Sequence, residues 1–204
     1  MNSESSIQRT EAFSDGVFAI ACTLLIIEIK VPKVEDENPL ALLNAILNQW
    51  PSFMAFFISF GSILVMWVNH HRSLKLITKT STTFLFANGF LLLTVTFIPY
   101  PTAVLAEYIN SPQANSAVMF FSMSYMFSNL GFNLWWQSFL RPEYLFNDSI
   151  EKKEINKLTK QTIGGFFIYL ATTIIAYWFP VTALCIIFAL FILWVGMSIG
   201  EKKK

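Results

Sequence analysis

The stretch that decides the fold class is residues 9–32, which read RTEAFSDGVFAIACTLLIIEIKVP. Its apolar part, from about Thr10 to Val31, is long enough to cross a hydrocarbon layer as a helix, which takes about 20 residues. The run opens with Arg9, Glu11 and Asp15 at or inside the membrane edge, where each ionised group costs roughly 2.5–3.5 kcal/mol on insertion scales. Such groups persist when they face water or protein, so we expect their partners on other helices.

The composition of the whole chain agrees with this first helix. Of 204 residues, 54% are apolar and only 13% are charged, against about 25% in a soluble domain. An all-α integral membrane protein, one domain over residues 1–204, is therefore predicted. The net charge of +1 argues against a nucleic-acid partner. Cys22 and Cys185 both lie in apolar runs without metal-ligand spacing, and we interpret them as small hydrophobic side chains.

Hydropathy and helix signals divide the chain into six transmembrane helices. Asn38-Pro39 and Ser111-Pro112 are typical helix starts, and Trp178-Phe179-Pro180 indicates a tight turn between the last two spans. The predicted spans are 10–31, 40–71, 81–107, 113–140, 161–179 and 180–199.

The distribution of Lys and Arg between the connections predicts the orientation. Twelve of these residues fall on one side, and only Lys30 and Lys33 fall on the other. Cytoplasmic loops carry the excess of positive charge, so both termini are expected in the cytoplasm. The outer first loop carries Glu35, Asp36 and Glu37, which form either an acidic mouth or an ordinary solvated loop.

Several later features have simpler interpretations. Trp135, Trp136 and Trp178 are predicted to be anchors at the membrane surface. The segment 151–160 alternates acids and lysines, which indicates a cytoplasmic amphipathic stretch or loop. The fourth span carries a polar stripe, interpreted as interhelical hydrogen bonding or as the lining of an accessory cavity. The stripe consists of Ser122, Ser124, Ser128, Asn129 and Asn133.

Polar residues of three spans fall at one depth near the cytoplasmic side. Counting the helical rise places Asp15, the segment 67–71 and Asn88 near one level, which predicts a buried polar network. Three roles are open for it: interhelical bonding, a proton relay through a histidine, or a metal site. His70 and His71 point about 100° apart on a helix, and the sequence does not choose between them.

An apolar stripe follows along the first helix. Ile20, Leu24 and Ile27 recur at helical spacing, with Thr23 beside them. The stripe either packs against other helices and lipid or lines a pore that it gates by dewetting. Periodicity alone leaves both interpretations open.

A resemblance to a known family bears on this choice. The string Arg9-x-x-x-Phe13-Ser14-Asp15-Gly16, with the apolar run after it, resembles the signature first helix of the bacterial relatives of transmembrane protein 175, an endosomal and lysosomal potassium channel. The resemblance implies a homotetramer of six-helix subunits whose first helices line a central pore, without a re-entrant selectivity-filter loop. Because the strong motif covers about the first thirty residues, the rest of the chain agrees only in architecture.

The resemblance also implies roles for individual residues. It places the narrowest constriction at Ile20, further apolar pore positions at Leu24 and Ile27, and a hydroxyl linked to potassium preference at Thr23. Where animal members carry a serine just before the constriction, this chain has Ala19, which leaves the strength of that preference open. The residues expected to hold the fold are Arg9, Phe13, Ser14 and Asp15 with Trp67, His70 or His71, and Asn88.

The function expected from the sequence is that of a potassium-permeable cation channel with a hydrophobic constriction. Its partners would be copies of itself, membrane lipids and monovalent cations, in the cell membrane of a prokaryote, with potassium as permeant ion and no cofactor or resident metal. The alternative is a proton-coupled secondary transporter that uses Asp15 with His70 or His71. No nucleophile–base arrangement is visible, so an enzyme is not expected.

Overall fold

The computed structural model describes residues 3–35, 37–138, 140 and 152–200, and this part of the chain is all-helical. Asp36, Arg141 and Lys202 to Lys204, which enter the predicted acidic loop and the charge asymmetry, lie outside the described residues. The helices are α1 (Ser3–Ile27), α2 (Ala41–Asn48), α3 (Trp50–Leu74), α4 (Thr82–Phe97), α5 (Pro99–Tyr108), α6 (Ala114–Ser138), α7 (Lys152–Ala176) and α8 (Pro180–Gly200).

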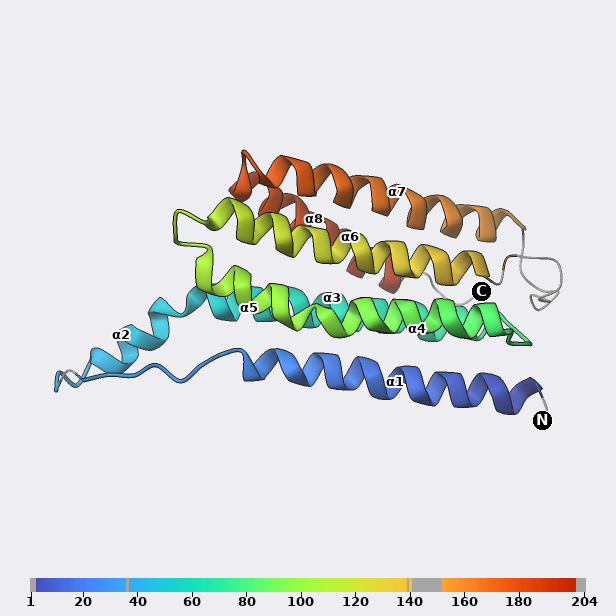
Figure 1. Ribbon diagram of the computed structural model, residues 1–204, viewed down its shortest axis with the longest axis horizontal. Helices are drawn as coiled ribbons and strands as arrows, with labels where there is room; N and C mark the ends of the chain where they lie inside the picture. The colour runs from blue at the N-terminus through green and yellow to red at the C-terminus, as the bar shows by residue number, and fades with distance from the viewer. Residues whose placement is uncertain (1–2, 36, 139, 141–151, 201–204) are drawn as a thin grey trace.

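The long helices run side by side along one axis, with α1 at one edge of the bundle and α7 at the other (Figure 1). Helix α1 contacts α3, α4 and α5, while α6 packs against α4, α5, α7 and α8. The start of α1 and the end of α8 lie at the same end of the bundle, and α2 projects beyond the opposite end (Figure 1). Helix α1 is therefore packed on one side only.

The second predicted span, 40–71, is divided into two helices. Helix α2 ends at Asn48, and α3 begins at Trp50 with Pro51 in its first turn. A proline lacks the backbone N–H, and its ring clashes with the carbonyl four residues earlier, so α2 cannot continue through Pro51. The spanning segment is α3 alone, and α2 is a separate short helix.

Other helix boundaries also differ from the prediction. Helix α1 ends at Ile27 rather than at Val31, and α7 begins at Lys152, so the segment 152–160 is helix and not loop. The third predicted span is two nearly continuous helices, α4 and α5, because Pro99 begins α5 directly after Ile98. Ser81 caps the start of α4, where its side chain accepts a hydrogen bond from the backbone N–H of Phe84.

Four helical segments of the described chain are long and apolar enough to cross a membrane: Ser6–Ile27, Trp50–Leu74, Thr82–Tyr108 and Pro180–Ile199. Helices α6 and α7 fall below this criterion because α6 carries its polar stripe and α7 carries lysines in its first turns. Part of the stripe is bonded to α7: Ser122 accepts from Thr173 (3.0 Å), and Asn133 donates to the carbonyl of Thr162 (2.9 Å).

The aromatic pair in α6 lies in the core and not at the membrane surface. Trp135 and Trp136 are 0% and 1% exposed, so the prediction that they are surface anchors is wrong. The indole of Trp136 donates to the hydroxyl of Thr159 at 2.9 Å, and Trp135 stacks against a histidine of α3. Trp178, which follows α7, is 62% exposed. A tryptophan side chain alone does not distinguish these two environments in the sequence.

Candidate functional site

Helix α1 has two different faces. Thr10, Ser14, Phe18, Ala21 and Leu25 recur every three or four residues and are all buried against the rest of the chain. The side chains of Ile20, Leu24 and Ile27 are 57%, 39% and 69% exposed, and Thr23 is exposed beside them. The predicted pore residues therefore lie on the face of α1 that the chain's own core does not cover.

The hydroxyl of Thr23 is tied to its own helix. Thr23 Oγ1 donates to the carbonyl oxygen of Ile20 at 2.9 Å, within one turn. A hydroxyl has one proton and two lone pairs, so this bond occupies the donor and leaves the oxygen as an acceptor. The exposed face of α1 thus presents an acceptor oxygen between two apolar side chains.

A first chain of hydrogen bonds joins the buried face of α1 to α4 and α3. Ser14 Oγ donates to the carbonyl of Thr10 at 2.8 Å and accepts from Asn88 Nδ2 at 3.0 Å. Asn88 Oδ1 lies 2.8 Å from His70 Nε2. Because an amide oxygen only accepts, His70 must carry its proton on Nε2. Ser14 and His70 are fully buried and Asn88 is 3% exposed, so the three helices are fixed relative to one another.

Aromatic rings enclose the buried histidine. The ring of Trp135 stacks on His70 with centroids 4.5 Å apart and an interplanar angle of 25°. The ring of Phe18 lies 5.4 Å away on a tilted plane. Within the described residues, His70 Nδ1 has no hydrogen-bond partner. The imidazole is therefore held by one hydrogen bond and two ring contacts.

One hydrogen bond and one close histidine–carboxylate contact join α1 to α3 directly. Trp67 Nε1 donates to Asp15 Oδ1 at 2.8 Å, and His71 Nδ1 lies 2.8 Å from Glu11 Oε1. The rings of Trp67 and His71 stack with centroids 5.8 Å apart. Asp15 and Glu11 are one turn apart on α1, as are Trp67 and His71 on α3, so two matched pairs hold the antiparallel helices in register.

The structure brings together Ser14, Asp15, Trp67, Asn88 and both histidines: His70 bonds to Asn88 of α4, and His71 contacts Glu11 of α1. It does not place Arg9 or Phe13 in this network. Arg9 and Phe13 lie one turn apart on the outer face of α1, so both side chains are exposed, and Phe13 is 65% exposed.

The expected partner of Glu11 on another helix is His71, although the sequence did not name that pair. Sequence reasoning missed Thr10 and Trp135 as members of the network. The hydroxyl side chains of Ser6, Thr10 and Ser14 recur every four residues, and this helical spacing could have placed Thr10 on the same face as Ser14. Glu11 precedes Asp15 by one turn and could have been paired with the residue one turn after Trp67. The contact between His70 and Trp135 spans 65 residues and has no local pattern that predicts it.

The fold matches that of a membrane channel of known structure. The chain matches the crystal structure of a lysosomal potassium-selective channel TMEM175 homolog from Chamaesiphon minutus with a TM-score of 0.85 and 40% sequence identity. The match covers 95% of this chain and 98% of that one.

Sequence comparison identifies the family. The family described as endosomal/lysosomal potassium channel TMEM175 matches residues 9–99. A protein of C. minutus named a potassium channel is 42% identical over 191 residues, which are 92% of this chain and 94% of that protein. Another protein named a potassium channel, from Streptomyces collinus, is 41% identical over 144 residues, 70% of this chain and 69% of that one. The chain belongs to the TMEM175 family.

Proposed function

We propose that the chain is one subunit of a homotetrameric potassium channel whose pore is lined by α1. The proposal is supported by the relatives named potassium channels and, above all, by the uncovered apolar face of α1. The polar network fixes the rotation of α1 about its axis, so that Ile20, Thr23 and Ile27 point away from the subunit. A single helix cannot enclose a pore, but copies related by a rotation axis can.

Four copies of this face would produce a narrow apolar tube. A ring of Ile20 side chains forms the constriction, and rings of Leu24 and Ile27 continue it outward. A tight apolar ring empties of water, so conduction requires the α1 helices to rotate or separate. The Thr23 oxygens, whose protons are bonded to the backbone, accept the ion in place of part of its hydration shell. We expect this layer to give a modest preference among alkali cations.

The same proposal includes six transmembrane segments with both termini in the cytoplasm of a prokaryotic cell. It is supported by the twelve-to-two distribution of basic residues and by the location of the start of α1 and the end of α8 at one end of the bundle (Figure 1). Residues 1–204 then form one channel unit, with potassium as permeant ion and with no cofactor or enzymatic reaction proposed.

A proton-coupled carrier is the weaker alternative. It would need Asp15 and a histidine to exchange protons with the solvent on alternating sides. Asp15 accepts from the Trp67 indole, whereas His70 belongs to the separate chain through Asn88 and Ser14. These contacts resemble fixed interhelical bonds rather than a relay, so we assign the network to holding α1.

Potassium flux through purified protein in liposomes tests the pore. Ile20→Asn introduces polar side chains into the constriction, so we expect a higher conductance in single-channel recordings under a potassium gradient. Ile26→Asn is the matched control, because Ile26 is 54% exposed on another side of the same helix. Equal conductance of Ile20→Asn and the unaltered protein would overturn the assignment of the constriction. A chain count in detergent tests the tetramer.

A further inference from the structure

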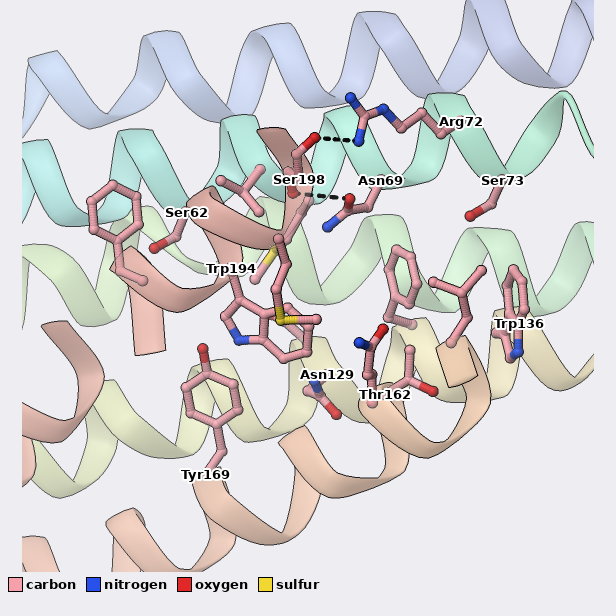
Figure 2. A pocket seen from close by; sticks show the side chains of 18 of the residues that line it. Ser62, Asn69, Arg72, Ser73, Asn129, Trp136, Thr162, Tyr169, Trp194 and Ser198 are labelled. Carbon is pink, nitrogen blue, oxygen red and sulfur yellow. Dashed lines mark hydrogen bonds between the residues drawn. The ribbon is translucent and has the colours of Figure 1, made fainter. Parts of the chain in front are cut away.

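A cavity of about 210 Å³ lies within the helix bundle, bounded by α3, α6, α7 and α8 (Figure 2). On α3 it extends from Ser62 to Ser73, which is the half of the helix that also carries the polar network. Among the described residues, those that join α1 to α3 and α4 do not line the cavity. The cavity is therefore separate from the proposed pore.

Close contacts between helices set the walls of the cavity. Phe191 and Trp194 of α8 both line it, and each ring lies against a glycine of another helix. A Cβ atom at Gly61 would lie 2.7 Å from the ring of Phe191, and a Cβ atom at Gly165 would lie 3.0 Å from the ring of Trp194. The two glycines thus allow α8 to approach α3 and α7 closely, and the cavity is formed by this packing before any ligand binds.

Most of the walls are apolar, and several are aromatic. Phe132, Trp136, Phe191 and Trp194 line the space, together with aliphatic side chains of α3 and α7. A cavity of about 150 Å³ lined by apolar side chains accepts benzene. The larger volume here suits one aromatic ring with a short alkyl tail.

The charge at one end of the cavity is engaged in the protein itself. Arg72 is the charged residue among the described lining side chains, and none of them is an Asp or Glu. Arg72 Nη1 donates to the carbonyl oxygen of Ser198, and the side chain of Arg72 has a further interaction. We therefore assign Arg72 to the contact between α3 and α8. An ion that enters an apolar cavity without a partner is costly, so this lining favours a neutral ligand.

The amide of Asn69 gives the cavity a hydrogen-bond donor. Asn69 Oδ1 accepts from Ser198 Oγ at 3.1 Å, so the N–H₂ of the amide is turned into the space (Figure 2). Within the described part of the chain, this N–H₂ has no protein acceptor. Ser73, one turn further along α3, lines the same end of the cavity and is 8% exposed. A ligand oxygen at this end would satisfy the donor of Asn69.

We propose that this cavity binds a neutral, compact amphiphile, with an aromatic or short alkyl body and one hydrogen-bond-accepting oxygen. The body lies among the aromatic side chains, and the oxygen accepts from Asn69 Nδ2. Because a donor left unpaired in an apolar cavity is costly, the oxygen distinguishes this ligand from a hydrocarbon of the same shape. The absence of charge distinguishes it from a carboxylate of the same shape.

The location of the cavity connects it to the pore helix. Asn69 and Ser73 line the ligand space, while Trp67 and His71 of the same turns of α3 contact Asp15 and Glu11 of α1. A bound ligand therefore contacts the segment of α3 that holds α1. A consequence for gating rests on the proposed function, whereas binding itself does not.

Fluorine NMR with 3-(4-fluorophenyl)propan-1-ol tests the site on the full chain in detergent micelles. The apolar reference is 1-butyl-4-fluorobenzene, in which a methyl group replaces the hydroxyl, and the charged reference is 3-(4-fluorophenyl)propionate. Each affinity is referred to the concentration of the ligand in the micelles, which is measured without protein.

We expect saturable binding of the alcohol, about three- to tenfold tighter than that of the hydrocarbon, which is the range that one neutral hydrogen bond supplies. The carboxylate should bind more weakly than the alcohol. Equal or tighter binding of either reference to the unaltered protein would overturn the proposal.

Three variants locate the binding. Val65 lines the cavity, so Val65→Phe should abolish binding, and the control Leu64→Phe, at a neighbouring residue that is 45% exposed and outside the cavity, should retain it. Asn69→Leu should bring the alcohol and the hydrocarbon to equal affinity, and a preference retained in this variant would overturn the role of Asn69.

The proposal stays testable if Asn69→Leu fails to fold because Asn69 also accepts from Ser198. The comparison of the three ligands and Val65→Phe then decide. Unchanged binding by Val65→Phe would show that the ligand only dissolves in the micelle, which would overturn the site.

The readout needs no ion flux. Failure of binding therefore leaves the proposed pore untouched, and failure of the Ile20→Asn experiment leaves the proposed cavity site untouched.

Discussion

The indole Nε1 of Trp67 donates a hydrogen bond of 2.8 Å to Oδ1 of Asp15, and this bond joins α3 to α1 across 52 residues of sequence. A carboxylate at the membrane edge is costly unless it is paired, and this bond pairs it. The bond also helps to fix which face of α1 is turned inward, because Asp15 adjoins Ser14, which is fully buried against α4. Ser14 and Asp15 of the first-helix motif thus orient α1 against α3 and α4.

Replacement of Asp15 with Ala should lower the stability of the subunit. The variant leaves the Trp67 N–H without its acceptor, which costs about 1–3 kcal/mol for a buried group and toward the lower end within a membrane. We expect a lower melting temperature and a lower yield of assembled protein by size-exclusion chromatography with light scattering. Asp15→Asn keeps an acceptor oxygen and should lose less.

The control for this experiment is Glu28→Ala, an exposed carboxylate after the end of α1, which should leave both measurements unchanged. Normal melting and assembly of Asp15→Ala would contradict an orienting role and favour a direct role of Asp15 in transport.

Asn88 and His70 should be energetically coupled. Asn88→Leu leaves the Nε2–H of His70 buried and unpaired, at a cost of about 1–3 kcal/mol. His70→Phe keeps the ring against Trp135 and removes that N–H, so the double variant should be less destabilised than the sum of the two single variants. Thermal unfolding of the four proteins measures the coupling, and strict additivity would show that the bond contributes nothing.

The sequence predicts the depth of the network better than its partners. Counting helical rise places Asp15, Trp67 and Asn88 at one level, and in the structure each bonds to a neighbouring helix: Asp15 to Trp67, and Asn88 to Ser14 and His70. The choice between His70 and His71 could not be made, because adjacent residues on a helix face different neighbours and both found one.

The remaining differences between the predicted and observed helices have physical causes that a hydropathy pattern does not report. The break before α3 depends on one proline, Pro51, inside a run that is apolar throughout. The early start of α7 at Lys152 depends on charged residues that are compatible with either helix or loop. The uncovered face of α1 could be predicted from the resemblance but not from its composition, which also suits lipid.

Trp135→Leu should destabilise the fold strongly although the residue lies outside the sequence motif. The substitution removes the stacked partner of His70 and leaves a void in a fully buried position, which we expect to cost about 2–4 kcal/mol. Trp178→Leu is the matched control, because that indole is 62% exposed, and its effect should stay within about 0.5 kcal/mol. Differential scanning fluorimetry in detergent compares the two. Similar melting temperatures of the two variants would contradict a stabilising role of Trp135.

Thr23→Ala should lower the preference for potassium over sodium without closing the pore. The substitution removes the acceptor oxygen between Ile20 and Ile27 but keeps the helix and the constriction. If each oxygen replaces part of the hydration shell, a loss of about 0.5–1 kcal/mol corresponds to a permeability ratio lowered about two- to fivefold. The reversal potential under biionic conditions measures this ratio. Thr23→Ser keeps the hydroxyl and should keep the ratio, so an equal shift in Thr23→Ala and Thr23→Ser, or none in either, would contradict a role for the oxygen.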